Sequence, residues 1–181
     1  KTGLASDWSF ISASTSDAYR QLRETLGYCG IYIFENGVVG FNATRKLDIH
    51  EFRAFCLYDK RVPLIFINAT DTPEGKLFSL LHETVHIALG EDDIFSNNHI
   101  AEERYCNSVA AELLMPSSLF RQCWENNTSG KSSTKTAEIV SRKFCASLSA
   151  TAIKAKDIGL ITNNEASSII NTANEKLGKN S

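Results

Sequence analysis

Apolar positions in the first half of the chain fall into short runs that are typical of β-strands. Each run is rich in β-branched and aromatic side chains and is bounded by polar turns. The runs cover residues 30–34, 38–41, 53–58 and 62–67. Asn36-Gly37, between the first two runs, predicts a β-hairpin. Pro63 has no backbone N–H to donate, so the fourth run is expected at the edge of a sheet.

The rest of the chain carries apolar residues at helical spacing. Helices are predicted over residues 17–26, 73–89, 100–115, 135–145, 149–158 and 164–177. The second of these opens at Asp71-Thr72-Pro73-Glu74, which supplies a capping side chain and a proline in the first turn, and it ends before Gly90. It is apolar on nearly every side, so we expect it to be buried.

A polar segment, residues 126–134, separates the last three predicted helices from the rest. We therefore expect an α+β fold in which a small three- to four-stranded sheet packs on a helical core, with an all-helical subdomain at the C-terminal end. The predicted domains are residues 1–128 and 129–181. Helices around residues 139–153 have the shape of a winged-helix or helix-turn-helix element, for which packing or substrate docking is the preferred role.

Composition and charge exclude several classes of protein. The formal net charge is −2, and residues 131–181 hold 8 basic and 4 acidic groups without a dense basic face. Direct binding of nucleic acid is therefore not expected. No apolar run approaches the ~20 residues that cross a bilayer, so no membrane partner is expected. The 5 cysteines are scattered and odd in number, which favours free thiols in the cytoplasm.

The main chemical signal is His82-Glu83-Thr-Val-His86 within the buried helix. Residues four apart leave the same face of a helix, so both imidazoles can bind one Zn²⁺. Glu83 is placed to accept a proton from water in the open coordination position, as a general base. Two imidazoles and a carboxylate without partners would be costly in an apolar helix, and a metal removes that cost.

A catalytic zinc site needs a third protein ligand, and the helix over 100–115 offers Glu102 and Glu103 as candidates. Glu103 lies near the predicted core face and is the preferred ligand. Asn107, one turn further on, is expected to accept a hydrogen bond from His82 and so fix that ring. For Glu102 and Glu112 a solvent-facing position fits the pattern as well as any functional role.

These two segments together resemble the ImmA/IrrE family of metallo-endopeptidases. The resemblance rests on the His82–His86 motif followed by Glu103-x-x-Cys106-Asn107-x-x-Ala-Ala-Glu-Leu-Leu-Met-Pro116, and it spans roughly residues 28–120. It implies a zincin core with Glu103 as the third zinc ligand. The family commonly has Ala where Cys106 stands, a small change beside the site.

The resemblance also implies a function, which is cleavage of a helix-turn-helix transcriptional repressor, fused or encoded nearby, to release a stress or mobile-element response. Two alternatives are a zinc- or ligand-sensing regulatory domain that cuts nothing routinely, and a toxin-antitoxin-like partner that acts by binding. The intact Glu83 favours the peptidase, because neither alternative needs a general base.

Two further parts of the mechanism are expected from the sequence. A donor that stabilises the oxyanion is sought among His99, Tyr105, Tyr58 and Arg53. An extended substrate segment is expected to add to the edge strand over residues 64–67 as an extra strand.

Overall fold

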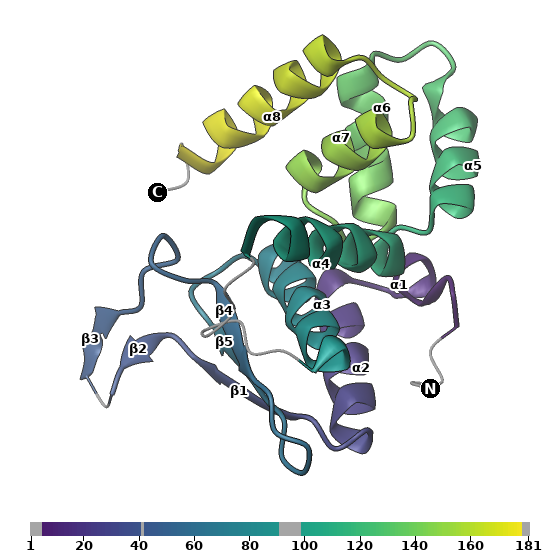
Figure 1. Cartoon of the computed structure of the whole chain (residues 1–181). Coiled ribbons are helices and arrows are strands. Elements are labelled where there is room, and N and C mark those ends of the chain that lie inside the picture. Colours follow the sequence, from purple (N-terminus) through teal and green to yellow (C-terminus); the bar gives the residue numbers. More distant parts are fainter. Residues whose placement is uncertain (1–4, 41, 91–98, 179–181) are drawn as a thin grey trace.

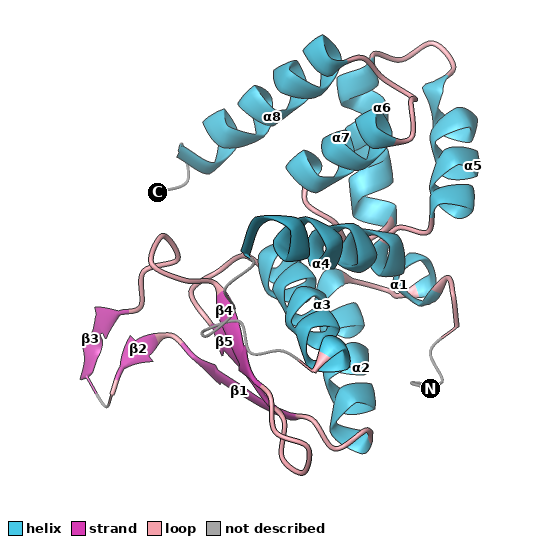
Figure 2. Cartoon of the chain, viewed as in Figure 1, coloured by secondary structure: helices cyan, strands magenta, loops and turns pink. Residues whose placement is uncertain are grey.

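The structure is a computed structural model that describes residues 5–40, 42–90 and 99–178 (Figure 1). Helices dominate, and the strands are confined to residues 32–68 (Figure 2). In chain order the elements are α1 (Trp8–Ile11), α2 (Thr15–Tyr28), β1 (Tyr32–Asn36), β2 (Val38–Val39), β3 (Asn42–Lys46), β4 (Ala54–Leu57), β5 (Leu64–Asn68), α3 (Pro73–Leu89), α4 (His99–Leu114), α5 (Ser117–Thr128), α6 (Ser133–Lys143), α7 (Leu148–Asp157) and α8 (Asn163–Gly178). This arrangement confirms the predicted α+β class. None of the described helices is both long and apolar enough to cross a membrane.

The main sheet has the strand order β1-β5-β4, with β1 parallel and β4 antiparallel to β5. The expected edge position of the fourth run is therefore wrong, because β5 is the central strand. Pro63 precedes the first ladder residue, Leu64, and its carbonyl accepts a hydrogen bond from the Tyr32 N–H at 2.9 Å. The missing proline N–H thus lies outside the ladder and breaks none of its hydrogen bonds.

The hairpin predicted at Asn36-Gly37 is also wrong. β2 pairs with β3 in a separate two-stranded sheet, while β1 pairs with β5. The Asn36 side chain accepts from the backbone N–H groups of Gly37 and Val38 at 2.9 and 3.3 Å, which turns the chain locally. A β-carbon on Gly37 would lie 3.4 Å from Ala69 Cβ, an ordinary van der Waals contact, so the packing here does not by itself require glycine.

One face of the sheet is buried under helices and the other is open. Ile65 and Ile67 are fully buried on the inner face, which α2 and α3 cover (Figure 1). On the outer face Phe55 stacks on Phe66 with 5.2 Å between ring centroids, and Phe34 is half exposed. The metal-binding motif therefore lies on a helix that is packed against the inner face.

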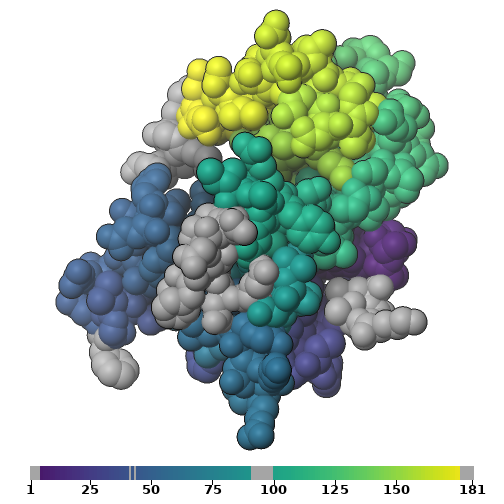
Figure 3. All heavy atoms as spheres, viewed as in Figure 1, coloured from purple at the N-terminus to yellow at the C-terminus, as the bar shows by residue number. Residues whose placement is uncertain are grey.

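The C-terminal helices lie against α4 on its far side from the sheet (Figure 3). Of these, α5 is absent from the predicted helices, although Phe120, Cys123 and Trp124 are buried at helical spacing. Buried side chains on both sides of residue 128 belong to one hydrophobic cluster, and the predicted domain boundary there stays a prediction.

The α6–α7 pair is joined by a short turn, and α7 packs one of its faces into the core. Cys145 in the turn adopts φ +54°, a left-handed conformation that is uncommon for residues other than glycine. On α7, Thr151, Ala152 and Ala155 are fully buried. The opposite face, which carries Ile153 and Asp157, is exposed, so the predicted packing or docking role of this pair stays a prediction.

Candidate metal centre

Local sequence sets both ends of α3, the helix that carries the motif. The Thr72 hydroxyl accepts a hydrogen bond from Gly75 N–H at 3.1 Å, and Gly90 ends the helix in the left-handed conformation at φ +79°. Asp71, buried just before the helix, pairs with Arg53 at 3.0 Å. A β-carbon on Gly75 would overlap the Asp71 carboxylate, so glycine is required for this close approach.

Three side chains from α3 and α4 converge on one point. Nε2 of His82 and Nε2 of His86 lie 3.1 Å apart, and the Glu103 carboxylate lies 3.3 Å from the first and 3.1 Å from the second. These residues form the one group of metal-binding type among the described residues. Sequence reasoning identified all three, and the structure brings them together.

The separations fit a tetrahedral metal site. Ligands about 2.05 Å from a tetrahedral Zn²⁺ lie roughly 3.3 Å from one another. The donor set also requires a positive charge, since a carboxylate and two imidazole lone pairs are all acceptors. Bringing three acceptors together in a half-buried site is unfavourable without a cation or protons between them. We conclude that the group is suited to hold a metal ion.

Glu83 lies beside this group and is protected from water. It follows His82 directly on α3, and only 3% of its surface is exposed. A carboxylate in this position has two chemical uses, as a proton acceptor and as a negative charge near the metal. Its role as general base stays a prediction.

Glu102 is the residue for which the sequence left a solvent-facing and a functional position open. Its side chain is 14% exposed, and Oε1 lies 3.4 Å from Nδ1 of His86. Of these two, the structure agrees with the position beside the metal group. The one available signal was its place next to Glu103: consecutive helical residues diverge by about 100°, so the pair can approach one ring from two sides.

Arg53, Asn107 and Tyr105 are the next candidates. Arg53 is held by Asp71, eleven residues before His82, which is ~16 Å along a helix. Asn107 and Tyr105 are exposed on α4, and their predicted roles stay predictions.

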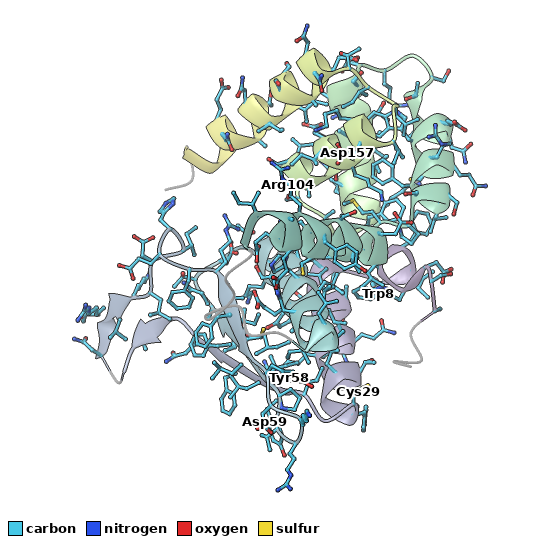
Figure 4. The ribbon with its side chains drawn as sticks, viewed as in Figure 1. Trp8, Cys29, Tyr58, Asp59, Arg104 and Asp157 are labelled. Atoms are coloured by element: carbon cyan, nitrogen blue, oxygen red, sulfur yellow. The ribbon has the colours of Figure 1, made fainter. Side chains whose placement is uncertain are left out.

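Two other predicted oxyanion donors lie at the ends of elements. Tyr58 follows β4, near the end of α3 (Figure 4), and its ring would lie 3.5 Å from a β-carbon on Gly90. His99 begins α4, but its side chain lies outside the described residues. Both roles stay predictions.

Glu112 has a structural role that holds α4 in place. It accepts hydrogen bonds from Ser117 N–H and Oγ at 2.9 and 2.6 Å, and it forms an ion pair with Lys154 of α7. Burial raises the pKa of Glu112, but the hydrogen bonds from Lys154 and Ser117 outweigh it and leave the pKa below its ordinary value. The helix that supplies Glu103 is thus tied to the C-terminal helices.

Comparison with known proteins agrees with this geometry. Residues 28–156 match the model of a peptidase family described as the IrrE N-terminal-like domain. Two radiation response metalloproteases named IrrE are similar to the chain. The protein of Deinococcus radiodurans is 36% identical over 78 residues, which is 38% of this chain and 24% of the relative. That of Deinococcus deserti is 39% identical over 72 residues, or 34% of this chain and 26% of the relative.

The chain thus spans about a quarter of the length of each relative. The family match is broader, since it covers most of the chain and includes both helices of the metal group. The chain therefore belongs to the IrrE N-terminal-like domain family, the ImmA/IrrE group of metallopeptidases that its motifs resemble.

Proposed function

We propose that this chain is a zinc-dependent endopeptidase whose substrate is a helix-turn-helix transcriptional repressor, fused or encoded nearby, and that cleavage releases a stress or mobile-element response. The observation that supports this most is the convergence of His82, His86 and Glu103 beside the buried Glu83. The proposed compartment is the cytoplasm, in keeping with 5 free cysteines.

His82, His86 and Glu103 would hold the zinc, and Glu83 would move the proton. Bound zinc supplies a Lewis acid that polarises the scissile carbonyl and lowers the pKa of water. Glu83 takes a proton from the attacking water as its oxygen forms a bond to the carbonyl carbon. The C–N bond then breaks, and Glu83 passes that proton to the leaving nitrogen.

The substrate strand cannot add to β5, as the sequence suggested, because β5 has a neighbour on each side. Of the two edge strands, β4 packs against α3, and its pairing within the described residues is with β5 alone. We therefore place an extended substrate segment along the outer edge of β4. Two sets of substrate peptides test this, one N-methylated at even and the other at odd backbone positions. Strand pairing uses the N–H groups of only one set, so it predicts slower cleavage for that set and not for the other. Equal rates for both would refute it.

The test of the function is the intact mass of a co-expressed repressor with wild-type protein and with Glu83→Gln. Glu83→Gln retains the metal ligands and loses the base, so the repressor is expected to be shortened only by the wild type. If the repressor stays whole in both while zinc remains bound, a sensing or binding role replaces the peptidase.

A further inference from the structure

The metal group uses only one of the two ring nitrogens of His86, which is a buried ligand. Nε2 of His86 faces the point where the three ligands converge, whereas Nδ1 points to the other side of the ring. His86 is 1% exposed, so water cannot readily serve Nδ1. Within the described part of the chain, Nδ1 makes no hydrogen bond, and Oε1 of Glu102 lies 3.4 Å from it.

We propose that Glu102 is a positioning residue that accepts the Nδ1–H of His86 and thereby directs the lone pair on Nε2 toward the metal. The separation of 3.4 Å between Nδ1 and Oε1 is longer than the ~2.7–3.2 Å of an ordinary N–H···O bond. Accepting the N–H therefore requires the Glu102 side chain to rotate toward Nδ1. The carboxylate is 14% exposed, so its attraction for the N–H is only weakly screened by water.

This assignment gives α4 two functions within one turn. Glu103 contributes its oxygen on the Nε2 side of the His86 ring, and Glu102 contributes its oxygen on the Nδ1 side. A neutral imidazole has one N–H, and the hydrogen bond at one nitrogen decides that the other carries the lone pair. Partners of this kind typically change metal affinity 10–100-fold when they are removed.

Asn107, the partner that the sequence suggested for His82, is exposed on α4. The carboxylate of Glu102 serves the other histidine, His86, and precedes the third ligand in sequence, so it is independent of the prediction for Asn107. The inference concerns metal binding, so it depends on the metal site in the proposed function and not on peptide cleavage.

The experiment measures zinc affinity by chelator competition on the full chain, for wild type, Glu102→Ala, Glu102→Gln and Glu125→Gln. Glu125 is exposed on α5 and controls for the loss of one negative charge. We expect zinc affinity to fall 10–100-fold in Glu102→Ala and less in Glu102→Gln, whose amide oxygen still accepts the N–H. Glu125→Gln should match the wild type.

The tautomer of His86 is read separately, in the metal-free protein above neutral pH, by long-range ¹⁵N–¹H NMR. The wild type is expected to carry its proton on Nδ1, and Glu102→Ala to lose this preference. Unchanged zinc affinity in Glu102→Ala, equal losses in the Ala and Gln variants, or a proton on Nε2 in the wild type would each overturn the assignment. A wild type that binds zinc but cuts no repressor would contradict the peptidase and leave Glu102 unaffected.

Discussion

The ion pair between Lys154 and Glu112 leads to an asymmetric prediction. The Lys154 side chain is 8% exposed and the Glu112 side chain is 53% exposed. Replacing Glu112 leaves an ammonium group buried without its counter-charge, whereas replacing Lys154 leaves a carboxylate that water can reach. If both residues were equally exposed, replacing either one would lower the unfolding free energy equally. Because only Lys154 is buried, replacing Glu112 should lower it more.

The magnitudes follow from this difference in exposure. Removing one partner of a buried ion pair costs roughly 3–5 kcal/mol of unfolding free energy. Because Glu112→Gln retains an oxygen acceptor for Lys154 and Ser117, we expect it to lower the unfolding free energy by about 2–3 kcal/mol. In Lys154→Met the apolar part of the side chain is preserved and Glu112 is hydrated, so we expect a loss of about 0–1 kcal/mol. The double variant should be close to Lys154→Met, since it has no buried charge.

The free energy of unfolding is measured by urea titration of the four proteins at neutral pH with a chelator present. The chelator is needed because α4 carries Glu103, and bound metal would add its own stabilisation. Losses in Lys154→Met as large as those in Glu112→Gln would refute the reasoning, as would a double variant that loses the sum of both.

Three further outcomes are expected. Burial raises the pKa of Glu35, but hydrogen bonds from Lys76 and Tyr19 outweigh it, so its pKa is lowered in the folded protein. The stability that Glu35 contributes is therefore present above its unfolded pKa of ~4.3, and it is lost as pH falls through its folded pKa. Glu35→Gln should therefore reduce the fall in unfolding free energy at acid pH. Gly75→Ala should lower the unfolding free energy by ~1–3 kcal/mol, because its β-carbon overlaps Asp71. Gly27→Ala, whose β-carbon meets nothing within 4 Å, should raise the unfolding free energy or leave it unchanged. Equal effects of the two variants would contradict the packing argument. A chelator should lower the melting temperature in calorimetry and added zinc should restore it, and a melting temperature that responds to neither would count against a structural contribution from the metal.

The sequence predicted α3 well because its signals are local. A capping threonine, a proline in the first turn and a terminal glycine lie within the helix itself, and its bounds agree with Pro73–Leu89. The spacing of His82 and His86 likewise needs only helical geometry. Glu103 was harder to predict, since its place depends on how α4 lies across α3.

The errors concern pairing between distant segments. Asn36-Gly37 is a strong hairpin signal, but the parallel ladder between β1 and β5 takes precedence, since β5 pairs with a strand on each side and is buried on its inner face. Pro63 suggested an edge because the exact start of the ladder, at Leu64, cannot be read from the pattern.

The sequence by itself determined six of the helices, the α+β class and the two histidines of the metal group, because these depend on residues a few positions apart. Tertiary structure alone decided that β5 is central, that Glu112 holds α4 to α7, and that Glu102 lies against His86. The physical reason is that helical periodicity sets the face from which a side chain leaves. The group that it meets depends on how separate elements pack.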